Sequence, residues 1–277
     1  MRNFTESNLT DAVVARLART ENPRFKAVMT SLIRHLHAFI RDVELTEAEW
    51  AAAINFLTAT GQKCDADRQE FILLSDVLGV SMLVDAINHR GGDHVTESTV
   101  LGPFYIEGAP DLPAGFDISH GGEGEPTEVS GRVLTADGKP IKGAVLDVWQ
   151  TAPNGFYSTQ DPNQDRFNLR GRFRTDETGA YFFRTIKPTS YPVPTDGPVG
   201  LILNAMGRHP MRPAHLHFII TAPGYERLTT HLFVEGDPYL DSDVVFGVKN
   251  SLVVDFKPKP GAKTLEAKYD FGLKPAA

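Results

Sequence analysis

The sequence predicts an α+β protein in which an N-terminal helical region is followed by an antiparallel β-sandwich. Up to about residue 90, apolar residues recur at helical spacing and proline is nearly absent. After residue 95, prolines and glycines separate short β-branched and aromatic runs, and no helical pattern lies between these runs. We therefore divide the chain into a helical region, residues 1–95, and a β-sandwich, residues 96–277.

The overall composition is that of a globular, acidic protein. The 277 residues are 41% hydrophobic and carry a formal net charge of −7. No dense basic patch is present, which argues against nucleic acid as a partner. The single cysteine, Cys64, cannot form an internal disulfide, and no stretch approaches the ~18 apolar residues of a membrane span. We expect a cytoplasmic protein with no membrane span and no nucleic-acid partner.

The helical region contains three segments with helical patterns. "NPRFKAVMTSLIRHLHAFI" carries an apolar stripe that needs covering. "TEAEWAAAINFLTATG" opens with a capping box of Thr46 and Glu49 and ends at Gly61. "FILLSDVLGVSMLVDAI", residues 71–87, predicts one long apolar helix.

The later segments predict the strands. "VLDVWQ", "HLHFIITAPG", "LTTHLFVEGD" and "SLVVDFK" have strand composition, and "RGRFRTDETGAYFFRTI" predicts a hairpin that turns near Thr178 and Gly179. Residues 189–213 carry five prolines and three glycines. We expect this segment to be a long loop with a functional role.

The stretch "RPAHLHF" places His215 and His217 at the start of a strand. Residues two apart in a strand point to the same face, so both imidazoles share one face and Leu216 lies on the other. Two converging neutral imidazoles are typical of metal ligands, whereas solvated histidines at a strand end are the alternative. In the similar stretch "RHLHAF", His35 and His37 have helical spacing and diverge, so we assign them no metal role.

Further metal ligands must decide between the two interpretations. The chain has no second cysteine, so tyrosines, carboxylates and the remaining histidines are the candidates. Tyr157, in "PNGFYSTQD", and Tyr191, in "TSYPVP", both lie in irregular segments near strand ends. Side chains in such segments can converge on a site.

Four blocks together resemble the intradiol ring-cleaving dioxygenases, which are non-haem iron(III) enzymes that open catechol-type rings. The blocks are "ESTVLGPFYIEGAP" (97–110), "VLDVWQTAPNGFYSTQD" (145–161), "RGRFRTDETGAYFFRTIKPTSYPVPTDGPVG" (170–200) and "RPAHLHFIITAPGYERLTTHLF" (212–233). The resemblance covers about residues 25–260. It implies an iron(III) cofactor that is held by Tyr157, Tyr191, His215 and His217. Phenolate oxygens are hard, anionic donors that suit ferric iron.

The resemblance also implies the reaction and its catalytic residues. The substrates are an aromatic diol and O2, and the product is a cis,cis-muconate-type diacid. Tyr191 is expected to leave the metal and to take a proton from the diol. Arg212, three residues before His215, is expected to stabilise negative charge on the ring.

Details of the sequence are similar to the hydroxyquinol (1,2,4-trihydroxybenzene) branch of the family. The resemblance places Leu73 and Asp76 in the substrate pocket, where Asp76 would accept a hydrogen bond from the third hydroxyl. An exposed Asp76 on the outer edge of its helix is the alternative. The stretch "VLGPF" would contact the ring through Val100, Leu101, Gly102, Pro103 and Phe104. His231 stands where the catechol enzymes carry glutamine, and we expect it to support the metal ligands without binding the metal.

Three other interpretations remain open from the sequence. The substrate of a dioxygenase could instead be catechol or a chlorocatechol. A non-catalytic β-sandwich binding protein would explain the strands but not the four blocks. A zinc hydrolase would combine the two histidines with a carboxylate such as Asp161.

The N-terminal helices resemble the dimerisation region of the family, which implies a homodimer and a phospholipid at its interface.

Overall fold

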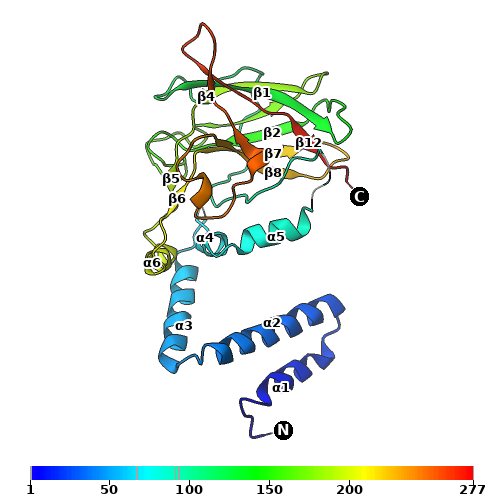
Figure 1. The fold of residues 1–277 in the computed structure, drawn as a ribbon, viewed down its shortest axis with the longest axis vertical. Coiled ribbons are helices and arrows are strands. Elements are labelled where there is room, and N and C mark those ends of the chain that lie inside the picture. The colour runs from blue at the N-terminus through cyan, green and yellow to red at the C-terminus, as the bar shows by residue number, and fades with distance from the viewer. Residues whose placement is uncertain (1, 67, 91, 93, 277) are drawn as a thin grey trace. The chain divides into compact units, whose positions relative to one another are not determined.

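The computed structural model describes residues 2–66, 68–90, 92 and 94–276. The predicted α+β class is confirmed: the chain begins with helices and continues into two β-sheets (Figure 1). Two compact units are present, of which the first ends at Thr58 and the second begins at Ala59. The second unit therefore includes the last helices of the helical region as well as the sheets. The division of the chain by composition, at residue 95, stays a prediction.

Two helices of the N-terminal region, Pro23–Asp42 and Glu47–Gln62, begin at side-chain caps. Asn22 Oδ1 accepts a hydrogen bond from Phe25 N at 3.0 Å, and the predicted capping box is present, with Glu49 Oε2 accepting from Thr46 N at 2.9 Å. No helix of the described chain is long and apolar enough to cross a membrane. The helical elements are α1 (Leu9–Ala15), η1 (Arg16–Arg19), α2 (Pro23–Asp42), α3 (Glu47–Gln62), α4 (Glu70–Val77) and α5 (Val80–Asn88).

The long helix predicted for residues 71–87 is wrong, because the structure breaks it at Gly79. This glycine has φ +73°, in the left-handed region, and separates α4 from α5. An L-residue with a side chain rarely adopts this conformation, so the glycine allows a sharp change of direction between two apolar helices.

The sheets form a sandwich in the second unit (Figure 1). One sheet has the order β10-β11-β1-β12, with β4 also paired to β1, and the other has the order β3-β2-β7-β8-β9. The pairs β1–β11, β1–β12 and β8–β9 are parallel, so the sheets are mixed. The strands are β1 (Pro126–Thr135), β2 (Val145–Trp149), β3 (Arg170–Arg174), β4 (Ala180–Ile186), β7 (His215–Thr221), β8 (Leu228–Val234), β9 (Val253–Val254), β10 (Lys257–Pro258), β11 (Leu265–Lys268) and β12 (Phe271–Leu273).

The core lies between the two sheets. Val129 and Phe183 enter it from one sheet, and Leu216 and Phe218 enter it from the other. The predicted hairpin of β3 and β4 is wrong, because β3 pairs with β2 and β4 pairs with β1, in different sheets. Alternating apolar residues mark a strand but do not specify its partner. The turn near Gly179 therefore carries the chain from one sheet to the other.

Residues 189–213, which were predicted to form a loop, contain ordered elements instead. β5 (Tyr191–Pro192) pairs with β6 (Met211–Arg212), and α6 (Pro198–Ala205) lies between them. The N-terminus of α6 is capped from α4, since Glu70 Oε1 accepts a hydrogen bond from Val199 N at 3.1 Å. Two short 3₁₀ helices follow later in the chain, η2 (Leu240–Ser242) and η3 (Asn250–Leu252).

We predict that Gly79→Ala destabilises the protein by about 1–2 kcal/mol, because the new side chain would require a left-handed backbone. The added Cβ would lie 3.5 Å from the Phe246 ring, so space is available and the cost comes from the backbone. Gly61→Ala is the matched control, since Gly61 lies within α3 and alanine there is neutral or stabilising. Denaturant unfolding measures both changes, and equal effects would contradict the prediction.

Candidate metal centre

Strand β7 directs two imidazoles to one face, as its sequence predicts. His215 and His217 are 1% and 2% exposed and lie on the face opposite the core, whereas Leu216 packs in the core. His35 is exposed on α2, and His37 contacts Thr10 through its Nδ1, so this second pair does not converge.

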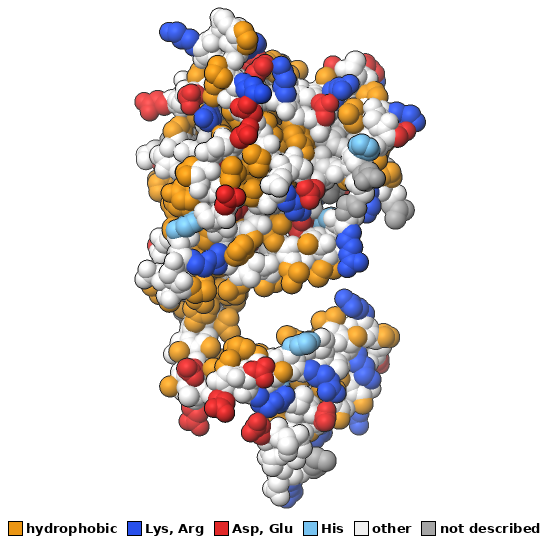
Figure 2. All heavy atoms as spheres, in the orientation of Figure 1, with side chains coloured by type: hydrophobic (Ala, Val, Ile, Leu, Met, Phe, Trp, Pro, Cys, Tyr) orange, Lys and Arg blue, Asp and Glu red, His pale blue; other side chains and the backbone are white. Residues whose placement is uncertain are grey.

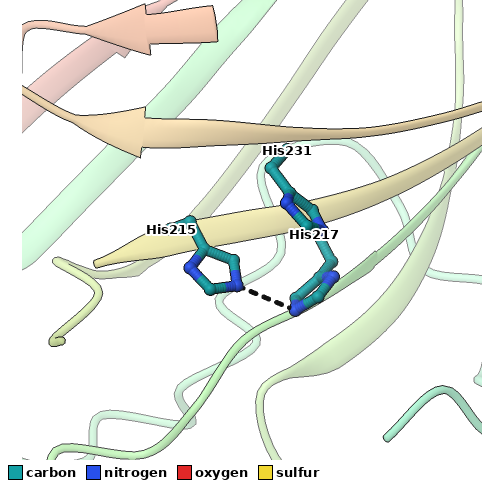
Figure 3. Close-up of side chains that lie close together, drawn as sticks. All are labelled: His215, His217 and His231. Carbon is teal, nitrogen blue, oxygen red and sulfur yellow. Dashed lines mark hydrogen bonds between the residues drawn. The ribbon is translucent and has the colours of Figure 1, made fainter. Parts of the chain in front are cut away.

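Four donor atoms meet beside β7. The His215 and His217 Nε2 atoms are 3.0 Å apart, and a dashed line joins them in Figure 3. Tyr157 Oη lies 2.8 Å from His217 Nε2 and donates a hydrogen bond to Tyr191 Oη at 2.9 Å. Each of these two imidazole nitrogens and two phenol oxygens therefore lies within hydrogen-bonding distance of at least one other. This is a donor set that can hold a metal ion.

The protonation states of the histidines suit metal binding. His215 Nδ1 lies 2.6 Å from the carbonyl oxygen of Pro213, and only an N–H can donate to a carbonyl oxygen. Nδ1 therefore carries the proton, and Nε2 is unprotonated and has a lone pair for a metal ion. Burial lowers the pKa of His215 and of His217 well below the usual value, and the positive charge of Arg212 lowers both further. Both rings are therefore neutral, which is the form that binds metals.

The tyrosines need a cation in order to ionise. Burial raises the pKa of Tyr157 well above its usual value, and the adjacent Tyr191 raises it further. Burial also raises the pKa of Tyr191, although Arg212 counteracts this in part. A metal ion at the four donor atoms would reverse the effect, because its charge stabilises the phenolates.

Arg212 lies beside the donor atoms. It is paired directly across β5 and β6 with Tyr191. Its Nη1 is 3.5 Å from Tyr191 Oη and 3.1 Å from His215 Nε2. Burial lowers the pKa of Arg212, but the charge of Asp243, the hydrogen bonds to its carboxylate and the two nearby tyrosines together outweigh burial and raise the pKa. The guanidinium is therefore a permanent buried cation at the site.

His231 lies next to the ligand candidates. It is fully buried on β8, opposite His217, with the two ring centroids 4.2 Å apart. Candidate ligand atoms of His215, His217 and His231 lie within 4.8 Å of one another (Figure 3). Neither nitrogen of His231 has a hydrogen-bond partner within 3.5 Å among the described residues. Burial lowers the pKa of His231, and a weaker contact with the Val100 backbone offsets this effect in part. The role of His231 as support for the ligands stays a prediction.

The helix that was predicted to line the pocket, α4, is buried at both predicted residues, and their placement in the pocket stays a prediction. Leu73 and Asp76 on α4 are each 2% exposed, so the alternative of an exposed Asp76 is wrong. Burial raises the pKa of Asp76 to about 6, whereas the Ser81 hydroxyl and the charge of Arg212 act to lower it. Asp76 therefore lies within electrostatic reach of Arg212.

The segment "VLGPF" also approaches the donor atoms. A Cβ on Gly102 would lie 3.4 Å from His217 Cε1, and the Phe104 ring stacks on Tyr157 with centroids 4.7 Å apart. Val100 is buried and Pro103 is half-buried. Leu101 is 38% exposed, which makes it the most exposed of these five residues.

Three site residues were missed by the sequence analysis. Trp149 stacks on the His217 ring at 4.6 Å, Arg170 lies 5.8 Å from the Tyr157 ring, and Asp243 pairs with Arg212. Trp149 could have been found as the last residue of the strand before Tyr157. Asp161 bonds to Asn154 and is not in the cluster of possible metal-binding side chains found in the described chain, so the zinc-hydrolase interpretation lacks its carboxylate.

Comparison with known proteins gives matches along the whole chain. A family model described as "Dioxygenase" matches residues 100–275, and one described as "Catechol dioxygenase N terminus" matches residues 22–94. The chain is 54% identical to the 6-chlorohydroxyquinol 1,2-dioxygenase of Cupriavidus pinatubonensis, over 99% of both chains.

Solved structures agree with these matches. The hydroxyquinol 1,2-dioxygenase of Pseudomonas putida is 55% identical with a TM-score of 0.91, over 98% of this chain and 99% of that one. The catechol 1,2-dioxygenase of Pseudomonas arvilla is 31% identical with a TM-score of 0.83, over 98% and 91%. Because both the sequence blocks and the fold match along nearly the full length, the chain belongs to the intradiol ring-cleaving dioxygenases.

Proposed function

We propose that this chain is an iron(III) enzyme that cleaves hydroxyquinol with O2 to give 3-hydroxy-cis,cis-muconate (maleylacetate). The observation that carries the proposal is the buried convergence of two phenol oxygens and two imidazole nitrogens, from Tyr157, Tyr191, His215 and His217. The names of relatives at 54% and 55% identity, which include hydroxyquinol, support the choice of substrate.

The donor set favours ferric iron. Two phenolates compensate much of the charge of a trivalent cation, and the neutral imidazoles complete the ligand set. When bound, ferric iron would draw electron density from the diol and make its ring carbons reactive toward O2. The family membership and the histidine cluster support a metal at this position.

The residues of the chain then manage protons and charge. Tyr191 Oη accepts a hydrogen bond from Tyr157 and lies 3.5 Å from Arg212 Nη1, so it is placed to take a proton from a diol hydroxyl. Arg212 provides a fixed positive charge where the ring becomes negative. Phe104 and Trp149 pack around Tyr157 and His217 and exclude water.

Asp76 supports hydroxyquinol over catechol as the substrate. A buried carboxylate is costly unless its oxygens have partners, and within the described chain the Ser81 hydroxyl is one partner of Asp76. The third hydroxyl of hydroxyquinol would supply a hydrogen bond that catechol lacks. The solved catechol enzyme is also less similar to this chain, at 31% identity, than the solved hydroxyquinol enzyme is.

The N-terminal helices support a further proposal, that the protein is a cytoplasmic homodimer with a phospholipid at the interface. On α2, Phe25, Leu32 and Phe39 are 54%, 53% and 54% exposed. Hydrophobic side chains are also visible on the surface of the helices in Figure 2. An apolar stripe of this size on a single helix is stabilised when a second apolar surface covers it.

We predict that Tyr157→Phe abolishes most of the visible absorbance of the iron-loaded protein, because a phenolate donor to the metal is lost. Tyr181→Phe is the matched control, since Tyr181 is also a buried tyrosine but donates to Tyr269 O in the core. Absorbance spectra and metal analysis should show about one iron per chain and a visible band in the control. A wild-type protein that is colourless, iron-free and active would refute the proposal.

We predict that Asp76→Ala lowers the preference for hydroxyquinol over catechol about 10- to 100-fold, because a hydrogen bond to a charged group contributes about 1.5–3 kcal/mol. The pKa of Asp76 is about 6, so the carboxylate forms as the pH rises through this value. The ratio of kcat/KM for the two substrates should therefore increase between pH 5 and pH 7 in the wild type and stay flat in the variant. An unchanged ratio in Asp76→Ala would show that the preference is set elsewhere.

We predict that Leu32→Asp weakens the dimer, because it places a charge on the apolar stripe of α2. Ser31→Asp is the control, since it adds the same charge at an exposed polar position next to it. Light scattering during gel filtration measures the mass, and mass spectrometry of an organic extract tests for phospholipid. A monomeric wild type, or an extract without lipid, would contradict the corresponding part of the proposal.

A further inference from the structure

Asp243 is a buried carboxylate that pairs with Arg212. Its side chain is 2% exposed, and each oxygen accepts two hydrogen bonds. Oδ1 accepts from Arg212 Nε at 3.2 Å and from Val245 N at 3.3 Å. Oδ2 accepts from Arg212 Nη2 at 3.4 Å and from Gly247 N at 2.9 Å. The carboxylate is therefore held by the backbone on one side and by the guanidinium on the other.

The two bonds use one edge of the Arg212 guanidinium. Nε and Nη2 face Asp243, which leaves Nη1 as the nitrogen that faces Tyr191 Oη and His215 Nε2. A guanidinium is planar and rigid, so fixing one edge fixes the direction of the third nitrogen. The position of the positive charge at the reaction site is thus set by the opposite edge of the same group.

The loop that carries Asp243 is held in a defined conformation. Phe246 has φ +60°, which is uncommon for a residue with a side chain and persists only where surrounding contacts hold it. Phe246 N bonds to Asp243 O at 3.0 Å, and Arg208 donates to Val244 O at 2.7 Å. Thr99 Oγ1 donates to Gly247 O at 3.1 Å. Contacts on both sides therefore fix the carboxylate from which Arg212 is positioned.

We propose that Asp243 is a positioning residue for the ring-cleavage reaction: it holds Arg212 so that Nη1 stays directed at Tyr191 Oη, beside the candidate metal ligands. This inference rests on the proposed function, because it takes the catalytic role of Arg212 from there. If Asp243 had a purely structural role and only neutralised a buried arginine, Asp243→Asn would leave kcat at the wild-type value.

The test compares Asp243→Asn with Asp85→Asn in the full-length, iron-loaded protein. Asp85 is a matched control, since it is also buried, at 8% exposure, and pairs with a cation, Lys249 Nζ at 3.2 Å. We expect kcat of Asp243→Asn to fall on the order of 100-fold, the loss expected for a displacement of about 1 Å. Iron content and the visible band should stay unchanged, and Asp85→Asn should keep its turnover. Wild-type kcat in Asp243→Asn, or an equal loss in both variants, overturns the proposal.

A double-mutant cycle separates positioning from stability. In an Arg212→Ala background, Asp243→Asn should cause no further loss of kcat, because there is no guanidinium left to position. A further 100-fold loss overturns the proposal. This pair lacks both buried charges, so it also tests the proposal if Asp243→Asn alone does not fold.

Unfolding midpoints of the four proteins of this cycle give a readout that does not depend on activity. The four are the wild type, Asp243→Asn, Arg212→Ala and the double variant. Asp243→Asn should shift the midpoint less in the Arg212→Ala background than in the wild type. Additive shifts would overturn the proposed role of Asp243 but would leave the proposed function of the protein intact. A wild-type protein that cleaves no diol would overturn the proposed function, and with it the role of Asp243, so the two failures are distinguishable.

Discussion

Strand β7 is buried on both faces, and both the core and the metal centre depend on this. Its even-numbered residues, Leu216 and Phe218 among them, fill the sandwich, and His215 and His217 face the other way. A shift of the strand by one residue would exchange the two sets. Pairing with β2 on one edge and β8 on the other prevents such a shift, and the same pairing brings Trp149 and His231 opposite His217.

The charges around β7 form one connected group. Arg212 contacts Asp243, and its charge offsets part of the effect of burial, which raises the pKa of Asp76. The two tyrosines next to this group stay neutral as long as no metal ion is bound, because burial raises the pKa of each. Binding of a metal ion by the two phenols, as proposed, would release their protons, so the affinity for the metal would increase with pH.

The sequence predicted the faces of β7 well, because spacing along a strand determines direction. Tyr157 and Tyr191 could be assigned only through the family resemblance, since they lie far from the histidines and from each other in the chain. The break at Gly79 was not predictable from the apolar pattern, which continues through it, and an isolated glycine is often tolerated within a helix. The pairing of β3 and β4 was not predictable either, because strands with the same alternation can choose different partners.

Asp243 shows a different limit of sequence analysis. It follows Asp237 and Asp241 in a segment with three aspartates, and nothing in the residue types marks one of them as buried. Its importance arises only from the fold, which places a tight loop beside β6. Burial and pairing of this kind depend on contacts between segments that are distant in the chain.

The parallel pairing of β1 affects how the protein can be synthesised. On one edge, β1 pairs with β4, and on the other edge both halves of β1 have late parallel partners, since Thr127 pairs with Leu265 and Val133 pairs with Phe271. On the ribosome, β1 emerges long before either partner, and its edge stays open while most of the second unit is translated. Closing such a large loop is slow, so this sheet is completed only after residues 265–273 have been synthesised. Until then, the exposed edge of β1 is a place where chaperones can bind or where nascent chains can aggregate.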